Sequence, residues 1–78
     1  MSPADANIIR DKLSRLREVT ALIEGILKTS RETFRKDTIL NNAAMYNLAI
    51  GIEIVIDIGN HILTQEFQKL AQIGRAHV

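Results

Sequence analysis

The sequence predicts an all-α protein, an antiparallel helical bundle in which two long helices are joined by a short helical turn. Two long stretches carry apolar residues at helical spacing, and each follows a residue suited to capping a helix. The 78 residues include no cysteine, and 46% of them are hydrophobic. This composition is typical of a folded domain in a reducing compartment, and its stability has to come from packing or association.

The first long helix is predicted to begin near Pro3. Ser2 can cap it, proline suits the first turn, and Asp5 places negative charge near the positive end of the helix dipole. Apolar side chains then recur every three, four or seven residues as far as Thr29. They are Ile9, Leu13, Leu16, Val19, Ile23, Ile26 and Leu27.

Charged residues fall mostly outside this apolar stripe. They are Arg10, Lys12, Arg15, Arg17 and Glu18. We expect them to form a solvated face of the helix rather than an RNA-binding patch, because no aromatic residue lies among them.

A short helical turn is predicted at residues 29–34, with Phe34 pointing inward and Thr29 and Ser30 as candidate caps. Asp37 or Thr38 then caps the second long helix. Its apolar pattern reaches at least residue 61 and continues toward residue 71, without a proline.

One segment of this second helix also fits a β-strand. Isoleucine alternates with other residues from Ile50 to Ile58, and Gly59-Asn60 is a suitable hairpin turn. Continuity with the helical flanks favours a helix, with isoleucines around most of its circumference. Glycine costs about 1 kcal/mol against alanine inside a helix, so we expect close packing at Gly51 and Gly59.

Three ionisable residues of this helix, Glu53, Asp57 and His61, recur at every fourth position and form one polar ridge. Two carboxylates and an imidazole can bind a divalent metal or share a proton. A buried polar network or a solvent-facing stripe is the other interpretation. Since three ligands on one straight helix rarely converge on one ion, we predict no metal site and no cofactor.

The segment from Ser30 to Leu63 resembles the HepT-like branch of the HEPN superfamily. Ser30 and Phe34 match a Ser-x-x-x-Phe turn that follows the leading helix in those proteins. The long helix matches the pattern Ala-Ile-Glu-x-x-Ile-Asp-Ile-x-x-His-Ile at Ala49, Ile50, Glu53, Ile56, Asp57, Ile58, His61 and Ile62. Gly51 and Ile52 interrupt the match between its second and third positions.

The resemblance implies a HEPN-like helical bundle that forms a homodimer and acts as the RNA-cleaving toxin of a toxin–antitoxin pair. The antitoxin of such a pair resembles a minimal nucleotidyltransferase. In the family, an Arg-x(4–6)-His motif on a later helix cleaves RNA without a metal at the dimer cleft. The 78 residues contain no such motif, since a single residue separates Arg75 from His77. No catalytic residue is therefore assigned, and Glu53, Asp57 and His61 are supporting candidates beside the cleft.

Two regions are expected along the chain. Residues 1–72 are the amino-terminal part of a HepT-like HEPN domain. Residues 73–78, Ile-Gly-Arg-Ala-His-Val, are the translation of the start of a common sequencing adapter, whose next codon is a stop. We therefore expect an adapter-derived tail, a bundle left incomplete after Gln72, and a chain that is inactive as an RNase.

The sequence also gives an expectation about location. Its start lacks the basic and apolar segments of a secretory signal. The apolar stretch from Leu48 to Leu63 is interrupted by polar residues and is shorter than the ~20 residues of a membrane-spanning helix. We expect a cytoplasmic protein that does not enter a membrane. A net charge of +1 provides no long-range attraction to nucleic acid.

A non-catalytic role is the alternative function. In that hypothesis the chain is a helical interaction module that binds a nucleotidyltransferase-like partner through its long helix. Under both hypotheses the first helix is too narrow to cover isoleucines on all sides of the second. We therefore expect an exposed apolar patch and self-association.

Overall fold

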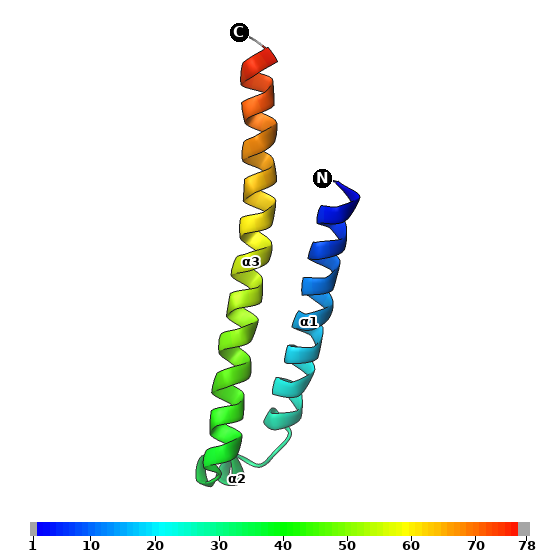
Figure 1. Cartoon of the computed structure of the whole chain (residues 1–78). Helices are drawn as coiled ribbons and strands as arrows, with labels where there is room; N and C mark the ends of the chain where they lie inside the picture. Colours follow the sequence, from blue (N-terminus) through cyan, green and yellow to red (C-terminus); the bar gives the residue numbers. More distant parts are fainter. Residues whose placement is uncertain (1, 77–78) are drawn as a thin grey trace.

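The computed structural model describes residues 2–76, and over this range the chain forms α-helices and no strand (Figure 1). Helix α1 spans Pro3–Leu27, α2 spans Arg31–Lys36 and α3 spans Thr38–Ala76. The two long helices lie side by side and run antiparallel, and α2 forms the turn between them (Figure 1). The all-α prediction is confirmed, and the alternative strand at residues 50–58 is excluded because α3 continues through it.

The start of α1 is fixed by a complete capping box. The backbone N–H of Asp5 donates to the hydroxyl oxygen of Ser2 over 3.1 Å, and the Asp5 carboxylate accepts from the Ser2 backbone N–H over 3.3 Å. The Ser2 hydroxyl also donates to this carboxylate over 2.6 Å. Because these bonds satisfy donors that a helix start leaves free, the predicted beginning at Pro3 is confirmed.

The turn between the long helices is held by side chains that bond to the backbone. Ser30 caps α2 by accepting from the N–H of Thr33 over 3.1 Å, and Asp37 caps α3 by accepting from the N–H of Leu40 over 3.0 Å. The Asn41 amide donates to the carbonyl oxygens of Phe34 and Asp37. These carbonyls lie where α2 ends and would otherwise lack an intrahelical partner.

The contact between α1 and α3 follows a three-and-four spacing on both helices, as in coiled coils. On α1 the less exposed positions along this seam are Ile9, Lys12, Leu16, Val19, Ile23 and Ile26. On α3 they are Leu40, Ala44, Asn47, Gly51, Ile54, Ile58, His61 and Gln65. The helices approach closely at Val19, which is 2% exposed, and at Gly51, where a Cβ would lie 3.5 Å from a Val19 methyl.

This seam corrects two expectations about α1. Lys12 was expected on a solvated face, but it lies in the seam and is half-buried. Leu13 and Leu27 were expected in the buried stripe, but they are 40% and 74% exposed. With one neighbouring helix, only a narrow a/d-type seam is covered, so residues at the borders of a wider stripe stay open to solvent.

The two glycines expected to pack closely differ. Gly51 faces Val19 and Leu16, as predicted. At Gly59 a Cβ would meet no atom within 4 Å, so the prediction of close packing is wrong there within this chain.

Helix α3 is longer than predicted and projects past the start of α1 (Figure 1). It continues across the boundary predicted at Gln72, which stays a prediction; His77 and Val78, the end of the predicted adapter tail, lie outside the described residues. The side chains of residues 66–75 are all exposed. The radius of gyration is 18.6 Å, against about 11–12 Å for a compact chain of this length.

The length and composition of α3 also match those of a membrane-crossing helix between Thr38 and Arg75, and none of the apolar window is buried inside the chain. The central helix of a water-soluble bundle meets the same criteria. The expectation that the chain does not enter a membrane therefore stays a prediction.

Replacing Val19 by alanine tests the seam. Two buried methyl groups are lost where the helices approach most closely, so we expect the free energy of unfolding to fall by about 1–2 kcal/mol. Leu22→Ala is the control: Leu22 is 57% exposed on the same helix, and the expected change is within about 0.5 kcal/mol. Urea unfolding followed by circular dichroism measures both; equal effects would mean that Val19 does not hold the helices together.

Candidate functional site

The hairpin has a polar cavity near the start of α1, with a volume of about 360 Å³. One residue comes from α1 and the rest come from the last half of α3. The lining residues are Asp5, Asp57, Asn60, His61, Thr64, Gln65 and Gln68. The chain therefore brings two carboxylates and an imidazole to one place, because the antiparallel arrangement sets the beginning of α1 against this part of α3.

An ion pair between the two long helices lies beside this cavity. The ammonium nitrogen of Lys12 is 3.0 Å from an Asp57 carboxylate oxygen, with side chains 28% and 62% exposed. A partly exposed pair contributes about 0.2–1 kcal/mol. Its main effect is on position: it holds the Asp57 carboxylate toward α1 and occupies one of its oxygens.

Asp5 lies on the α1 side of the cavity, and its capping role sets its charge state. The Ser2 hydroxyl donates to the carboxylate and lowers the pKa of Asp5 below its ordinary 3.8, with a smaller lowering from the backbone N–H of Ser2 and from the positive charge of His61. Asp5 is therefore a carboxylate near neutral pH. A negative group facing His61 favours the protonated imidazole.

Gln65 is an unfinished part of this cavity. The nitrogen and the oxygen of its side-chain amide are both shielded from solvent, and neither has a hydrogen-bond partner in the described structure. Leaving such groups unpaired costs about 1–3 kcal/mol each. Sequence reasoning missed Gln65, since a glutamine late in a helix carries no signal until the neighbouring helix is placed against it.

The predicted polar ridge divides in the structure. Asp57 and His61 line the polar cavity, whereas Glu53 is exposed and does not line it. Among residues 2–76 no group of three or more His, Asp or Glu side chains is placed to hold a metal ion. His61 can accept or donate a proton near neutral pH. The role of these residues beside an RNA-cleaving cleft stays a prediction.

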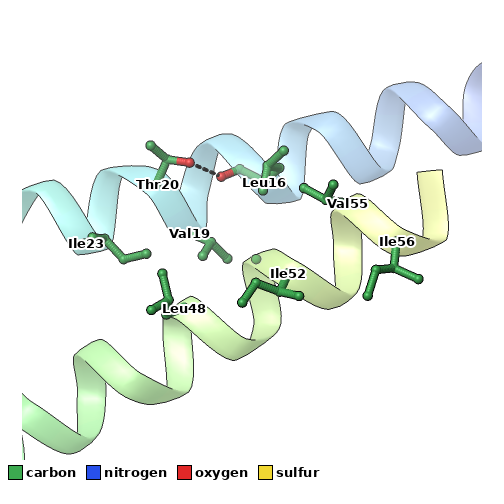
Figure 2. Close-up of a pocket in the computed structure, with 9 residues that line it drawn as sticks. Leu16, Val19, Thr20, Ile23, Leu48, Ile52, Val55 and Ile56 are labelled. Carbon is green, nitrogen blue, oxygen red and sulfur yellow. Dashed lines mark hydrogen bonds between the residues drawn. The ribbon is translucent and has the colours of Figure 1, made fainter. Parts of the chain in front are cut away.

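The other side of the hairpin is apolar. A groove of about 300 Å³ runs between α1 and α3. It is lined by Leu16, Val19, Thr20, Ile23, Leu48, Gly51, Ile52, Val55 and Ile56, which extend from the two helices toward the space between them (Figure 2). The hydroxyl of Thr20 donates to the carbonyl of Leu16 over 2.8 Å, so it presents no free donor to the groove (Figure 2).

An elongated helical hairpin with a polar cavity on one side and an open apolar groove on the other defines a class, that of all-α domains completed by further helices. Within that class the comparison with known families is specific, because the family model for HepT-like ribonucleases matches residues 8–74. The chain therefore belongs to the HepT-like ribonuclease family, as its resemblance implied. No curated protein and no solved structure matches it significantly.

The ion pair across the helices gives a test of the cavity. In a double-mutant cycle of Lys12→Gln and Asp57→Asn, we expect a coupling of about 0.2–1 kcal/mol at low salt, weakened in 1 M salt by screening. The matched cycle uses Arg15 and Glu18, 3.5 Å apart within α1; its coupling cannot report on the α1–α3 contact. Chemical unfolding gives the values, and a zero coupling for Lys12 and Asp57 at low salt contradicts the proposed contact.

The capping box predicts a pH effect. Because the pKa of Asp5 is lowered in the folded chain, its contribution is present above 3.8 and is lost as pH falls through the folded value. We expect the first turn of α1 to loosen over that acid range. An NMR titration of the Asp5 carboxyl carbon should give a pKa below 3.8, raised by Ser2→Ala and unchanged by Ser14→Ala. A titration unaffected by Ser2→Ala would count against the hydroxyl as the cause.

Proposed function

We propose that this chain is the amino-terminal helical part of an RNA-cleaving toxin from a toxin–antitoxin pair. The observation that carries this proposal is the match of residues 8–74 to the HepT-like ribonuclease family. The intact protein cleaves RNA by general acid and base catalysis, in which the 2′-hydroxyl attacks the neighbouring phosphate.

The 78 residues do not supply this chemistry by themselves. They contain no arginine followed by a histidine after four to six residues. His61 stands in the polar cavity with Asp5 and Asp57, and no arginine lines that cavity. A cavity with an imidazole and carboxylates but no arginine has no cation to stabilise the charge that develops on a phosphate in the transition state. The chain alone is therefore inactive as an RNase.

Asp57 and His61 act as supporting groups in the intact protein. Their side chains face one cavity beside the seam, and the Lys12 ion pair fixes Asp57. From there they can orient a catalytic side chain or an RNA hydroxyl that enters the cavity. The unpaired Gln65 amide, which needs one donor and one acceptor, is a further group that a later helix can satisfy.

The expected partners follow from the same proposal. They are a second copy of the chain, a nucleotidyltransferase-like antitoxin and RNA, all in the cytoplasm. The competing proposal is a non-catalytic adaptor that binds the nucleotidyltransferase-like protein through α3. It is favoured by the large exposed apolar area of α3, which includes Ile52, Val55 and Ile56. The two functions differ in whether a catalytic motif follows in the gene.

RNA cleavage distinguishes the two functions. We expect no cleavage of a fluorescent RNA by the purified 78-residue chain. The reading frame beyond Gln72 in genomic DNA should encode an Arg-x(4–6)-His motif, and the protein that includes it should cleave the same RNA without added metal. A frame without the motif favours the adaptor. Cleavage by the 78-residue chain that is lost in His61→Ala would overturn the proposed inactivity.

A further inference from the structure

An apolar stripe runs along the side of α3 that faces away from α1. Its positions recur at three-and-four spacing over most of the helix: Met45, Ala49, Ile52, Ile56, Gly59, Leu63 and then Phe67 and Leu70. The large side chains in this stripe are all more than half exposed. An α-helix with a seam on one side and a second, unpartnered seam on the other is built to contact two helices.

The exposed area shows how much contact is missing. The chain exposes 6362 Å², whereas a compact chain of 8.7 kDa exposes about 4,700 Å². The excess of about 1,700 Å² is twice the roughly 800 Å² that each partner buries in a standard protein–protein interface. An excess of this size is that of an obligate interface between subunits.

We propose that α3 pairs antiparallel with α3 of a second copy through this stripe, about a twofold axis that passes between Asp57 and Ile58. In this register Ile52 faces Leu63, and Ile56 faces Gly59 of the second copy. The outer layers follow the same rule, with Leu48 against Phe67 and Met45 against Leu70. The proposal deepens the self-association proposed above and does not depend on RNA cleavage.

The glycine in the stripe supports this register. Gly59 has no atom within 4 Å of a Cβ position, so nothing in its own chain requires a glycine there. Inside a helix it costs about 1 kcal/mol against alanine. In the antiparallel register the missing side chain leaves a hole that Ile56 of the second copy fills, once on each side of the axis.

Charge also favours the antiparallel direction. Glu66, which pairs with Lys69 over 3.4 Å, lies against Ala49 of the second copy, where a small side chain lets its carboxylate reach solvent. In a parallel pair in register, Glu66 would face Glu66 and Gly59 would face Gly59. That arrangement sets like charges together and leaves the hole empty.

The same register accounts for the projecting end of α3. Phe67 and Leu70 lie beyond the reach of α1 and are 68% and 61% exposed. An antiparallel copy places its own residues 45–48 beside them. The overhang of each copy is thus covered by the opposite end of the other α3, which α1 cannot do.

Disulfide cross-linking tests the register, because the chain has no native cysteine. We expect the double variant Ile52→Cys, Leu63→Cys to form a covalent dimer on mild oxidation. Each single variant alone should stay unlinked, since equivalent positions lie about 16 Å apart along the helices and a disulfide needs Cα atoms within about 7 Å. The matched control, Glu53→Cys with Thr64→Cys, has the same spacing on the polar side and should not cross-link.

Sedimentation of the unmodified chain separates this inference from the proposed self-association. A dimer whose double variant forms no link between positions 52 and 63 would overturn the register and leave self-association standing. A monomer at all concentrations would overturn both, and links formed by each single variant would show a parallel pair instead. Flotation of the chain with phosphatidylcholine vesicles, in place of dimers, would show lipid against the stripe and would also overturn the pairing.

Gly59→Leu provides a second test that does not depend on oxidation. The larger side chain fills the hole that Ile56 needs, so we expect dimer dissociation to increase at least about tenfold while the helix content of the monomer stays the same. Gly25→Leu is the control, because Gly25 lies on α1 and also has no atom within 4 Å of its Cβ position. Equal dissociation in both variants would contradict the contact at Gly59.

Discussion

The structure depends on one narrow contact, the seam where Val19 of α1 meets Gly51 of α3. Val19 is the single fully buried side chain among the described residues, so two helices of unequal length are aligned by one layer of close packing and by weaker contacts on either side. The antiparallel turn at α2 fixes the register of this layer. Once it is set, the start of α1 must lie against residues 57–68, and the polar cavity forms there as a consequence.

Local chemistry in the sequence was sufficient to predict where the helices begin. Ser2, Pro3 and Asp5 form a capping box with bonds over three residues, and Ser30 and Asp37 act over the same short range. Features that depend on how the helices face each other were not predictable in this way. Lys12 was placed with the solvated charges because periodicity describes one helix, while its half-buried position depends on the partner Asp57.

The candidate site shows the same division. Asp57 and His61 were found from four-residue spacing, which places them on one side of a helix. Asp5 and Gln65 join them only because α1 runs back along α3, a relation between residues about sixty positions apart. Glu53 fits the spacing equally well, but it lies one turn too far from the start of α1 to line the cavity. Spacing therefore identifies the side of the helix, and tertiary structure selects which of its residues act together.

The division of α3 into a polar side and an apolar stripe connects association with chemistry. A twofold axis perpendicular to two antiparallel helices leaves any direction along the axis unchanged, so a side chain that points along it in one copy points the same way in the other. The polar ridge lies roughly a quarter turn from the stripe at about 100° per residue. In the proposed pair, both ridges therefore lie on the same face of the dimer. Asp57 stands next to the axis in each copy, and His61 follows one turn away. A pairing driven by apolar burial thus gathers two sets of ionisable groups into one surface, which neither hairpin offers alone.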